Sequence, residues 1–209
     1  MLEKKLSLRA DERPVLPADE LPKGTAGRIL EAAVVRFATT GFRETSVREI
    51  AADVGINHAT LYSHFASKDE LLLAVLMLRH RSVEQEFELS GGPVTDDPRV
   101  RIALFMRAGM TAVTQYPFLA AVYVNEMQWL APELAAPLLT LYKGIIAATT
   151  RTIQDGIEQE RFRTVPAELA TGALGGLIEQ ATRWVAQNSY NDEEMTETYV
   201  DFALKMLSK

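Results

Sequence analysis

The 209-residue sequence contains no cysteine. Disulfides, thiol nucleophiles and cysteine-ligated zinc are therefore excluded, and we expect a reducing, cytoplasmic location. No run approaches the roughly 18 uncharged apolar residues that a membrane-spanning helix needs, so no membrane partner is expected. The opening stretch MLEKKLSLRADERP has no apolar segment of the kind found in secretory signals, and none is predicted.

Positive charge is also scarce, with 22 Lys and Arg against 28 Asp and Glu, a net charge of −6. The imbalance is uneven along the chain. Residues 1–68 carry 10 basic and 9 acidic side chains, whereas residues 69–209 carry 12 basic and 19 acidic ones. An acidic surface repels phosphate, so only the first third of the chain is a candidate for contact with nucleic acid.

Sustained alternation of apolar and polar residues is absent too, so we predict no strands and an all-α fold of about nine helices. Hydrophobic residues make up 47% of the chain, enough for a real core. Capping boxes, glycines and prolines predict the helix ends. The expected helices are 23–41, 46–55, 58–65, 67–88, 98–116, a shorter one after Pro117, 132–160, 166–188 and 192–207.

The stretch NHATLYSHF, residues 57–65, follows a short helix that a capping box opens at Ser46 and Gly55 ends. Asn57 is placed to cap the next helix, whose buried side needs Leu61 and Phe65. Two short helices joined by a tight turn are the helix-turn-helix pattern, whose second helix reads base edges in the major groove. The hydroxyls and imidazoles of the second helix then face outward to contact bases and phosphates; these residues are His58, Thr60, Tyr62, Ser63 and His64.

Metal binding is the enzymatic alternative for the same stretch. His58 and His64 are six residues apart, so on a helix they point roughly 120° away from each other, whereas a shared metal needs a spacing of four. The chain carries no G-x-S-x-G motif, P-loop or dinucleotide fingerprint, and GALGGL at 172–177 lies within a helical pattern. We therefore predict no metal, no cofactor and no enzymatic activity.

The run RILEAAVVRFATTGFRETSVREIAADVGINHATLYSHFASKDELL resembles the DNA-binding domain of the TetR family of repressors. The resemblance rests on GF.ETSV.EIA, the VGI turn, TLY.HF and SKDELL, in order and at the family's spacing. It implies DNA contacts by the starts of the two short helices, by the phosphate-gripping residues that follow, and by the start of the fourth helix: Ser46, Arg48, Asn57, His58, Ala59, Thr60, Tyr62, His64 and Lys68. Asn57-His58 departs from the family's usual residues, which bears on the operator sequence.

We accordingly divide the chain into a flexible arm (1–22), a helix-turn-helix DNA-binding domain (23–68) and a ligand-binding and dimerisation domain (69–209). One DNA-binding domain, or head, buries too little DNA for specificity, so we expect a homodimer on a palindromic operator. Small residues and an apolar stripe on the last two helices suggest a four-helix bundle between subunits, although such stripes also serve as intramolecular core. The candidates are Gly172, Ala173, Gly176, Leu177, Met195, Tyr199, Phe202 and Met206.

The middle helices are rich in large, adaptable side chains, which line ligand pockets and also fill cores. In a TetR-like protein the set suggests a pocket for an apolar or amphipathic effector: Phe105, Met106, Met110, Tyr123, Met127, Trp129 and Tyr142. A weaker resemblance, in VNEMQWLAP, IQDGIEQERFR and TRWVAQNSY, points to family members that sense acyl-CoA thioesters in lipid or steroid catabolism. It implies that Arg183 and Trp184 lie near the ligand or its entrance.

The function that these features predict is transcriptional repression, relieved when an effector shifts the spacing of the two heads. The helix that begins at Ser67 joins head to pocket and is the natural lever. Two alternatives stay open: an activator or ligand-independent regulator, and a helical small-molecule- or protein-binding module whose DNA binding is vestigial.

Overall fold

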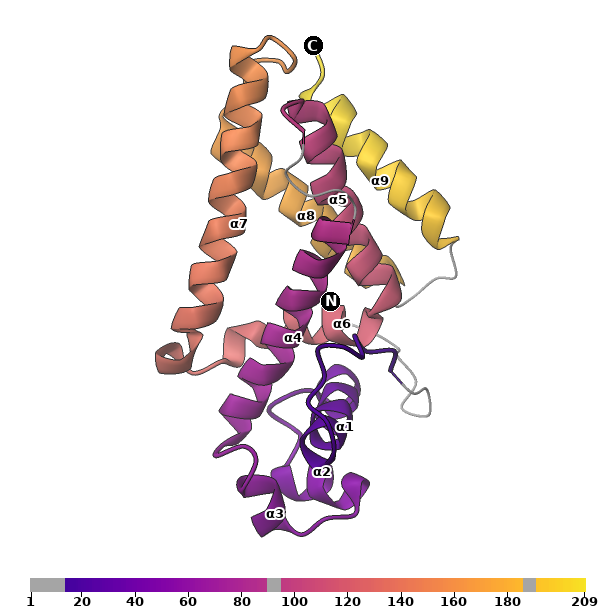
Figure 1. Cartoon of the computed structure of the whole chain (residues 1–209), viewed down its shortest axis with the longest axis vertical. Helices are drawn as coiled ribbons and strands as arrows, with labels where there is room; N and C mark the ends of the chain where they lie inside the picture. Colours follow the sequence, from indigo (N-terminus) through magenta and orange to yellow (C-terminus); the bar gives the residue numbers. More distant parts are fainter. Residues whose placement is uncertain (1–13, 90–94, 186–190) are drawn as a thin grey trace, which may run out of the picture. The chain divides into compact units, whose positions relative to one another are not determined.

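The computed structural model describes residues 14–89, 95–185 and 191–209, and these residues form nine α-helices and one 3₁₀ helix with no strand (Figure 1). The all-α prediction is therefore confirmed. In chain order the elements are α1 (Thr25–Thr39), α2 (Val47–Val54), α3 (His58–Tyr62), α4 (Lys68–Leu89), α5 (Pro98–Gln115), α6 (Pro117–Glu126), η1 (Met127–Trp129), α7 (Pro132–Glu158), α8 (Ala167–Val185) and α9 (Asp192–Leu207).

Packing divides the chain into two compact units. The first contains the described parts of Met1–Ser82 together with Gln115–Leu138, and the second contains those of Val83–Thr114 and Leu139–Lys209. Helix α6 belongs with the first unit because it packs on α1. The functional division at residue 68 stays a prediction.

The first unit is built around α1, whose apolar stripe of Ile29, Ala33 and Phe37 is buried, as its spacing of four predicts. Helix α2 packs on the same helix, and an ion pair on the outside joins the two. The Arg36 guanidinium donates to both carboxylate oxygens of Asp53, at 2.6 and 2.8 Å. This two-point bond raises the pKa of Arg36 and holds α2 in place.

The chain's local signals predict the helix ends well in both units. Asp97 caps α5 by accepting from the Arg99 N–H at 2.9 Å, with Pro98 at the first helical position. Pro117 ends α5 and opens α6, as predicted. The 3₁₀ turn η1 was not predicted. Residues 1–13 of the expected arm, and the end of the helix expected over 166–188, lie outside the described residues.

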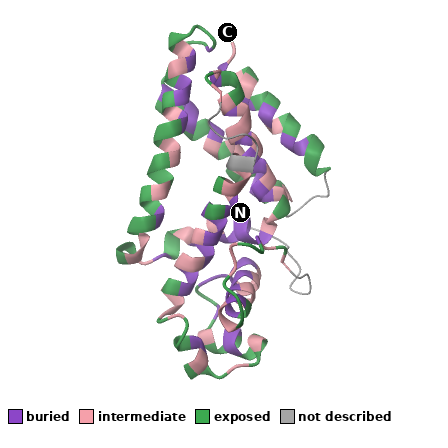
Figure 2. Cartoon of the chain, viewed as in Figure 1, coloured by how far each residue is buried: buried purple, intermediate pink, exposed green. Residues whose placement is uncertain are grey.

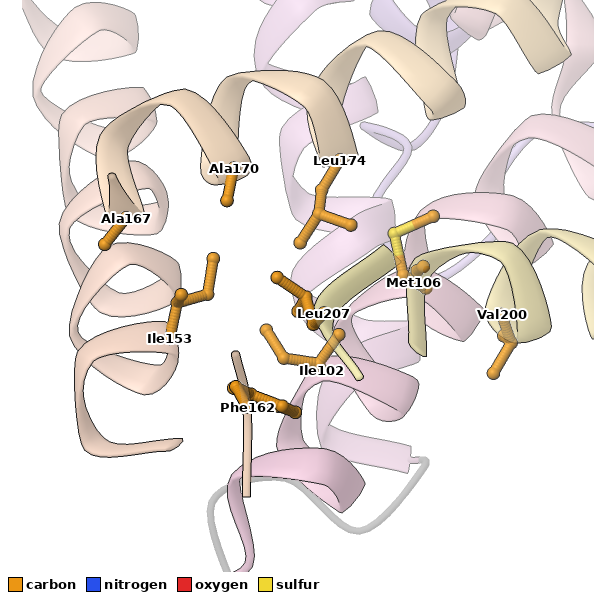
Figure 3. Close-up of a cluster of buried hydrophobic side chains, with 10 residues drawn as sticks. Ile102, Met106, Ile153, Phe162, Ala167, Ala170, Leu174, Val200 and Leu207 are labelled. Carbon is orange, nitrogen blue, oxygen red and sulfur yellow. The ribbon is translucent and has the colours of Figure 1, made fainter. Parts of the chain in front are cut away.

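The second unit has its own apolar core, contributed by α5, α7, α8 and α9 (Figure 3). Ile102 and Met106 of α5 belong to this core together with Ile153 of α7 and Leu174 of α8, and so does Phe162 from the turn after α7. Phe162 packs directly on Gly156, where an added Cβ would overlap the aromatic ring. Gly156 is therefore a packing requirement. No helix in the described ranges is long and apolar enough to cross a membrane.

Two glycines of α7 give a matched test of this packing. We expect Gly156→Ala to lower the free energy of unfolding by about 1–3 kcal/mol, because the buried Phe162 ring must move. Gly144→Ala should instead raise it by about 0.5–1 kcal/mol, since nothing lies near its added Cβ and alanine favours the helix. Urea unfolding of both variants checks the prediction, and an equal effect at the two sites would contradict it.

Candidate DNA-binding head and effector cavity

Helix α2 is fixed at its start by the predicted capping box. The Glu49 N–H donates to the Ser46 hydroxyl at 3.2 Å, and the Ser46 N–H donates to the Glu49 carboxylate at 2.8 Å. The hydroxyl of Ser46 also donates to that carboxylate, which lowers the pKa of Glu49. Gly55 ends the helix with φ of 72°, a left-handed conformation that glycine adopts without strain.

Helix α3 is capped by Asn57, whose side-chain oxygen accepts from the N–H and the hydroxyl of Thr60, at 2.8 and 3.0 Å. Leu61 is its buried anchor. The prediction that this helix runs to Phe65 is wrong, because the α-helix ends at Tyr62. The Ser63 hydroxyl donates to the Thr60 carbonyl at 2.7 Å, and the His64 N–H donates to Leu61, three residues back, so the chain tightens into a turn.

Most of the residues predicted to contact DNA, which lie at the start of α2 and around α3, are exposed to solvent, and much of this part of the chain is exposed in Figure 2. We call this set the reading face: Ser46, Arg48, Asn57, His58, Ala59, Tyr62 and His64. Thr60 is half-buried beside it. The rings of His58 and Tyr62 meet edge to face with centroids 4.5 Å apart. Tyr62 therefore orients the imidazole at the start of α3.

Lys68 differs from the reading face, because its ammonium group serves the protein itself. Its Nζ donates to the carbonyls of Phe42 and Thr45 at 2.8 and 3.0 Å and lies 4.4 Å from the centre of the Phe42 ring. These contacts brace the loop Gly41–Thr45, which joins α1 to α2. The resemblance alone implied a phosphate contact, and no local pattern signals the bond to the loop.

The same loop is held by α6 and η1 within the first unit. The buried carboxylate of Glu126 accepts from the Phe42 N–H at 3.1 Å. The Arg43 guanidinium lies 4.7 Å from the ring centre of Trp129, which was predicted for the effector pocket. Glu126 was not singled out from the sequence. Its partner is 84 residues away, so only the tertiary fold reveals the bond.

A cavity of about 430 Å³ lies in the second unit, between α4, α5 and α7. Its walls are mostly apolar, with a few polar side chains, as small-molecule sites require. The lining residues are Val83, Glu84, Phe87, Arg101, Ile102, Phe105, Ala108, Thr140, Leu141, Gly144, Ile145, Ala148, Thr149 and Thr152. The guanidinium of Arg101 is paired with Asp155 at 3.2 Å.

Of the predicted pocket residues, Phe105 lines this cavity, whereas Met106 and Met110 are fully buried. Tyr123 and Met127 are half-buried in the first unit, and Tyr142 and Arg183 are exposed. Trp184 lines a separate, smaller cavity of about 210 Å³ with Glu194, Met195, Thr198 and Tyr199. The composition of the sequence correctly pointed to α5 as a wall of the cavity. The small residues and threonines that α7 contributes to the wall could not be recognised from the sequence.

The predicted dimerisation residues on α8 lie in the open. Gly172, Ala173 and Gly176 are exposed, Leu177 is half-buried, and Leu169 on the same side is 73% exposed. On α9, Phe202 is 51% exposed and its ring lies 6.1 Å from that of Tyr199. Met195 is buried and Met206 is half-buried in the core of the unit. Leu169 is a further candidate that the sequence reading missed.

Comparison with protein families gives two matches. Residues 29–75 match the model described as bacterial regulatory proteins, tetR family, and residues 95–207 match the model described as Tetracyclin repressor-like, C-terminal domain. The second match alone covers more than half of the chain. Together they include the reading face and all of the residues that line the cavity except Val83, Glu84 and Phe87.

Two curated relatives share one name, HTH-type transcriptional repressor KstR2. The protein from Mycobacterium tuberculosis is 32% identical over 114 residues, 51% of this chain, and the match spans about half (53%) of the relative's length. The protein from Rhodococcus jostii is 29% identical over 187 residues, covering 80% of this chain and 84% of the relative.

Solved structures share the fold. The ketosteroid transcriptional regulator KstR2 of M. tuberculosis superposes with a TM-score of 0.81 at 24% identity, covering 91% of this chain and 98% of that one. AibR, solved in complex with isovaleryl coenzyme A and operator DNA, superposes with a TM-score of 0.76 at 22% identity, covering 83% and 95%.

Variants of Lys68 and Arg48 test which of these two cations stabilises the folded protein. We expect Lys68→Met to lower the free energy of unfolding by about 1–3 kcal/mol, because two loop carbonyls lose their donor. Arg48→Met, at an exposed position, should change it by less than about 0.5 kcal/mol. Thermal unfolding measures both. A Lys68→Met variant as stable as the unmodified protein would show that the loop does not need this brace.

Proposed function

Because the chain belongs to the TetR family of bacterial regulatory proteins, we propose that it is a homodimeric transcriptional repressor that a small apolar or amphipathic effector releases from a palindromic operator. The observation that carries the proposal is the reading face. It presents polar side chains and imidazoles from two short helices, each of which is fixed by its own side-chain cap.

The chemistry of the reading face supports contact with DNA. A major groove about 12 Å wide admits one helix, and α3 presents His58, Ala59 and Thr60 at the end that would meet base edges. Arg48 and Tyr62 are exposed and supply donors for phosphate oxygens. Asn57 has its side-chain oxygen occupied by the cap, so its amide N–H₂ group is the part left to donate to DNA.

Dimerisation is supported by the exposed apolar and small residues of the last two helices. Glycines at 172 and 176 permit a partner helix to approach closely, and Leu169 and Phe202 supply apolar area that water covers in the single chain. A twofold dimer would present two heads to half-sites about 34–36 Å apart. One head alone would bind with low specificity.

Effector binding is supported by the cavity of the second unit. About 430 Å³ of mostly apolar space suits a small hydrophobic body, and the threonine hydroxyls supply the few polar contacts that orient a ligand. An acyl-CoA thioester is one amphipathic effector of this kind, and AibR binds isovaleryl coenzyme A. The phosphates of such a coenzyme need cations. The Arg107 guanidinium is bound to Glu197 at 2.6 Å, whereas Arg151 and Arg183 are exposed and can serve that role.

DNA binding is tested first by selecting sequences from a random duplex pool. We expect a palindrome to be enriched and its affinity to fall steeply as salt rises, because phosphate contacts release counterions. His58→Ala should relax the preference at one position per half-site, by about 1–3 kcal/mol. Tyr62→Phe keeps the ring that orients His58 and removes only the hydroxyl, so it should weaken all sequences similarly.

Two outcomes of this experiment would contradict the proposal. Failure of the pool to yield any enriched sequence would remove the DNA-binding function. Equal loss on every sequence in His58→Ala would remove the base-reading role of that residue while leaving the regulator intact.

Effector release is tested at two neighbouring alanines of α7. Ala148 lines the cavity and Ala147 does not. We expect Ala148→Trp to fill the cavity, keep operator affinity and lose at least tenfold of the response to decanoyl-CoA, measured as the rise in operator Kd. Ala147→Trp should respond as the unmodified protein does. A full response in Ala148→Trp would place the effector elsewhere.

A further inference from the structure

Helix α4 carries a buried cation at a position where the fold expects an apolar side chain. Leu72, Val75 and Leu76 form a fully buried stripe, and Arg79 occupies the next position on the same side of the helix. Arg79 is only 7% exposed. Arg81, two residues on, instead reaches the surface and pairs with Glu20 at 3.4 Å. The helix thus sends one arginine outward and keeps the other inside.

The guanidinium of Arg79 has a buried polar atom without a partner among the residues that the structure describes. Its Nε is fully covered and makes no hydrogen bond, and no carboxylate in these ranges forms an ion pair with it. Burial lowers the pKa of Arg79 to about 10, with the Tyr123 phenol as its electrostatic neighbour, so the group is still charged at neutral pH. A buried charge without a counterion destabilises a fold, and natural proteins pair such charges.

We propose that Arg79 binds an oxyanion, the carboxylate or phosphate of an amphipathic ligand. A guanidinium presents donors in a fork that matches two oxygens of a carboxylate or phosphate, and low exposure strengthens such a bond. The Tyr123 side chain is the neighbouring polar group of the site.

The position of Arg79 connects this site to the loop of the head. Lys68 precedes it by 11 residues on α4, which places the two side chains on the same side of the helix about three turns apart. Tyr123 precedes Glu126 by one turn on α6. Lys68 and Glu126 are the residues that hold Phe42 of the loop. An anion at Arg79 therefore acts on the two helices that brace the loop.

The test measures the Tm of the full chain with three probes that share one alkyl tail: decanoate, monodecyl phosphate and decanol. The two anions are used below their micelle concentrations and decanol below its solubility limit. We expect the two anions to raise the Tm by about 3 to 6 °C at ten times Kd, and decanol to raise it less. Arg79→Met should abolish the difference between anion and alcohol. Arg81→Met removes a charge from the same helix at the surface and should respond as the unmodified protein does.

A second readout needs no probe. Arg79→Met removes the uncompensated charge at nearly constant volume, so its own Tm should be higher than that of the unmodified chain by about 2 to 4 °C. Arg79→Lys keeps the positive charge but lacks the forked guanidinium donors, so it should retain only part of the anion response. This variant still tests the proposal if Arg79→Met folds poorly.

The proposal is overturned if neither anion raises the Tm more than decanol does, or if Arg79→Met keeps the full anion response. It is also overturned if the partner of Arg79 is a carboxylate of the protein itself. Glu3, Asp11 and Glu12 lie outside the described residues, so the variant Glu3→Gln, Asp11→Asn, Glu12→Gln is made with and without Arg79→Met. A Tm loss that appears only with Arg79 present would identify such a partner. Sequence-selective DNA binding is measured without a probe, so failure of the repressor function is seen separately.

Discussion

The loop Gly41–Thr45 is the point on which the head depends, because its backbone is bonded from three directions. Lys68 of α4 donates to two of its carbonyls, Glu126 of α6 accepts from the Phe42 N–H, and the Thr45 hydroxyl donates to Gly41 at 2.7 Å. Backbone groups that are buried away from water need such partners. The loop sets where α2 starts, and α2 sets where α3 lies. Two charged side chains from distant helices therefore fix the reading face.

Helix α4 carries a different kind of interaction in each part of its length. Its first residue braces the loop, its apolar stripe forms core in the first unit, Arg79 ends that stripe with a charge, and Val83, Glu84 and Phe87 line the cavity of the second unit. A continuous helix transmits displacement along its axis because its backbone bonds resist bending. Under the proposed function, a ligand that binds two states of the protein with different free energies would shift the balance between those states.

Local chemistry explains why so much of the fold could be predicted from the sequence. Ser46, Asn57 and Asp97 cap helices through residues two or three positions away, and Pro117 interrupts a helix by removing its own N–H donor. Such signals need no tertiary information. The end of α3 was predicted too late because the hydroxyl of Ser63 bonds back to Thr60 and competes with continued helix.

The positions of the ligand-facing residues needed the tertiary structure. Phe105 lines the cavity and Met106 is core, although the two are neighbours of similar size and hydrophobicity, because one residue along a helix turns the side chain by about 100°. Trp129 contacts Arg43 through a turn that no local pattern predicts.

The sequence by itself determined the helices, their caps and the helix-turn-helix pattern of the DNA-binding domain, since these depend on neighbours along the chain. Only the tertiary structure decided which cations are free for a ligand. Lys68 donates to the loop, Arg107 pairs with Glu197, and the buried Arg79 keeps an Nε without a hydrogen-bond partner in the described residues. Whether a charge is free or engaged depends on partners that folding brings from distant parts of the chain.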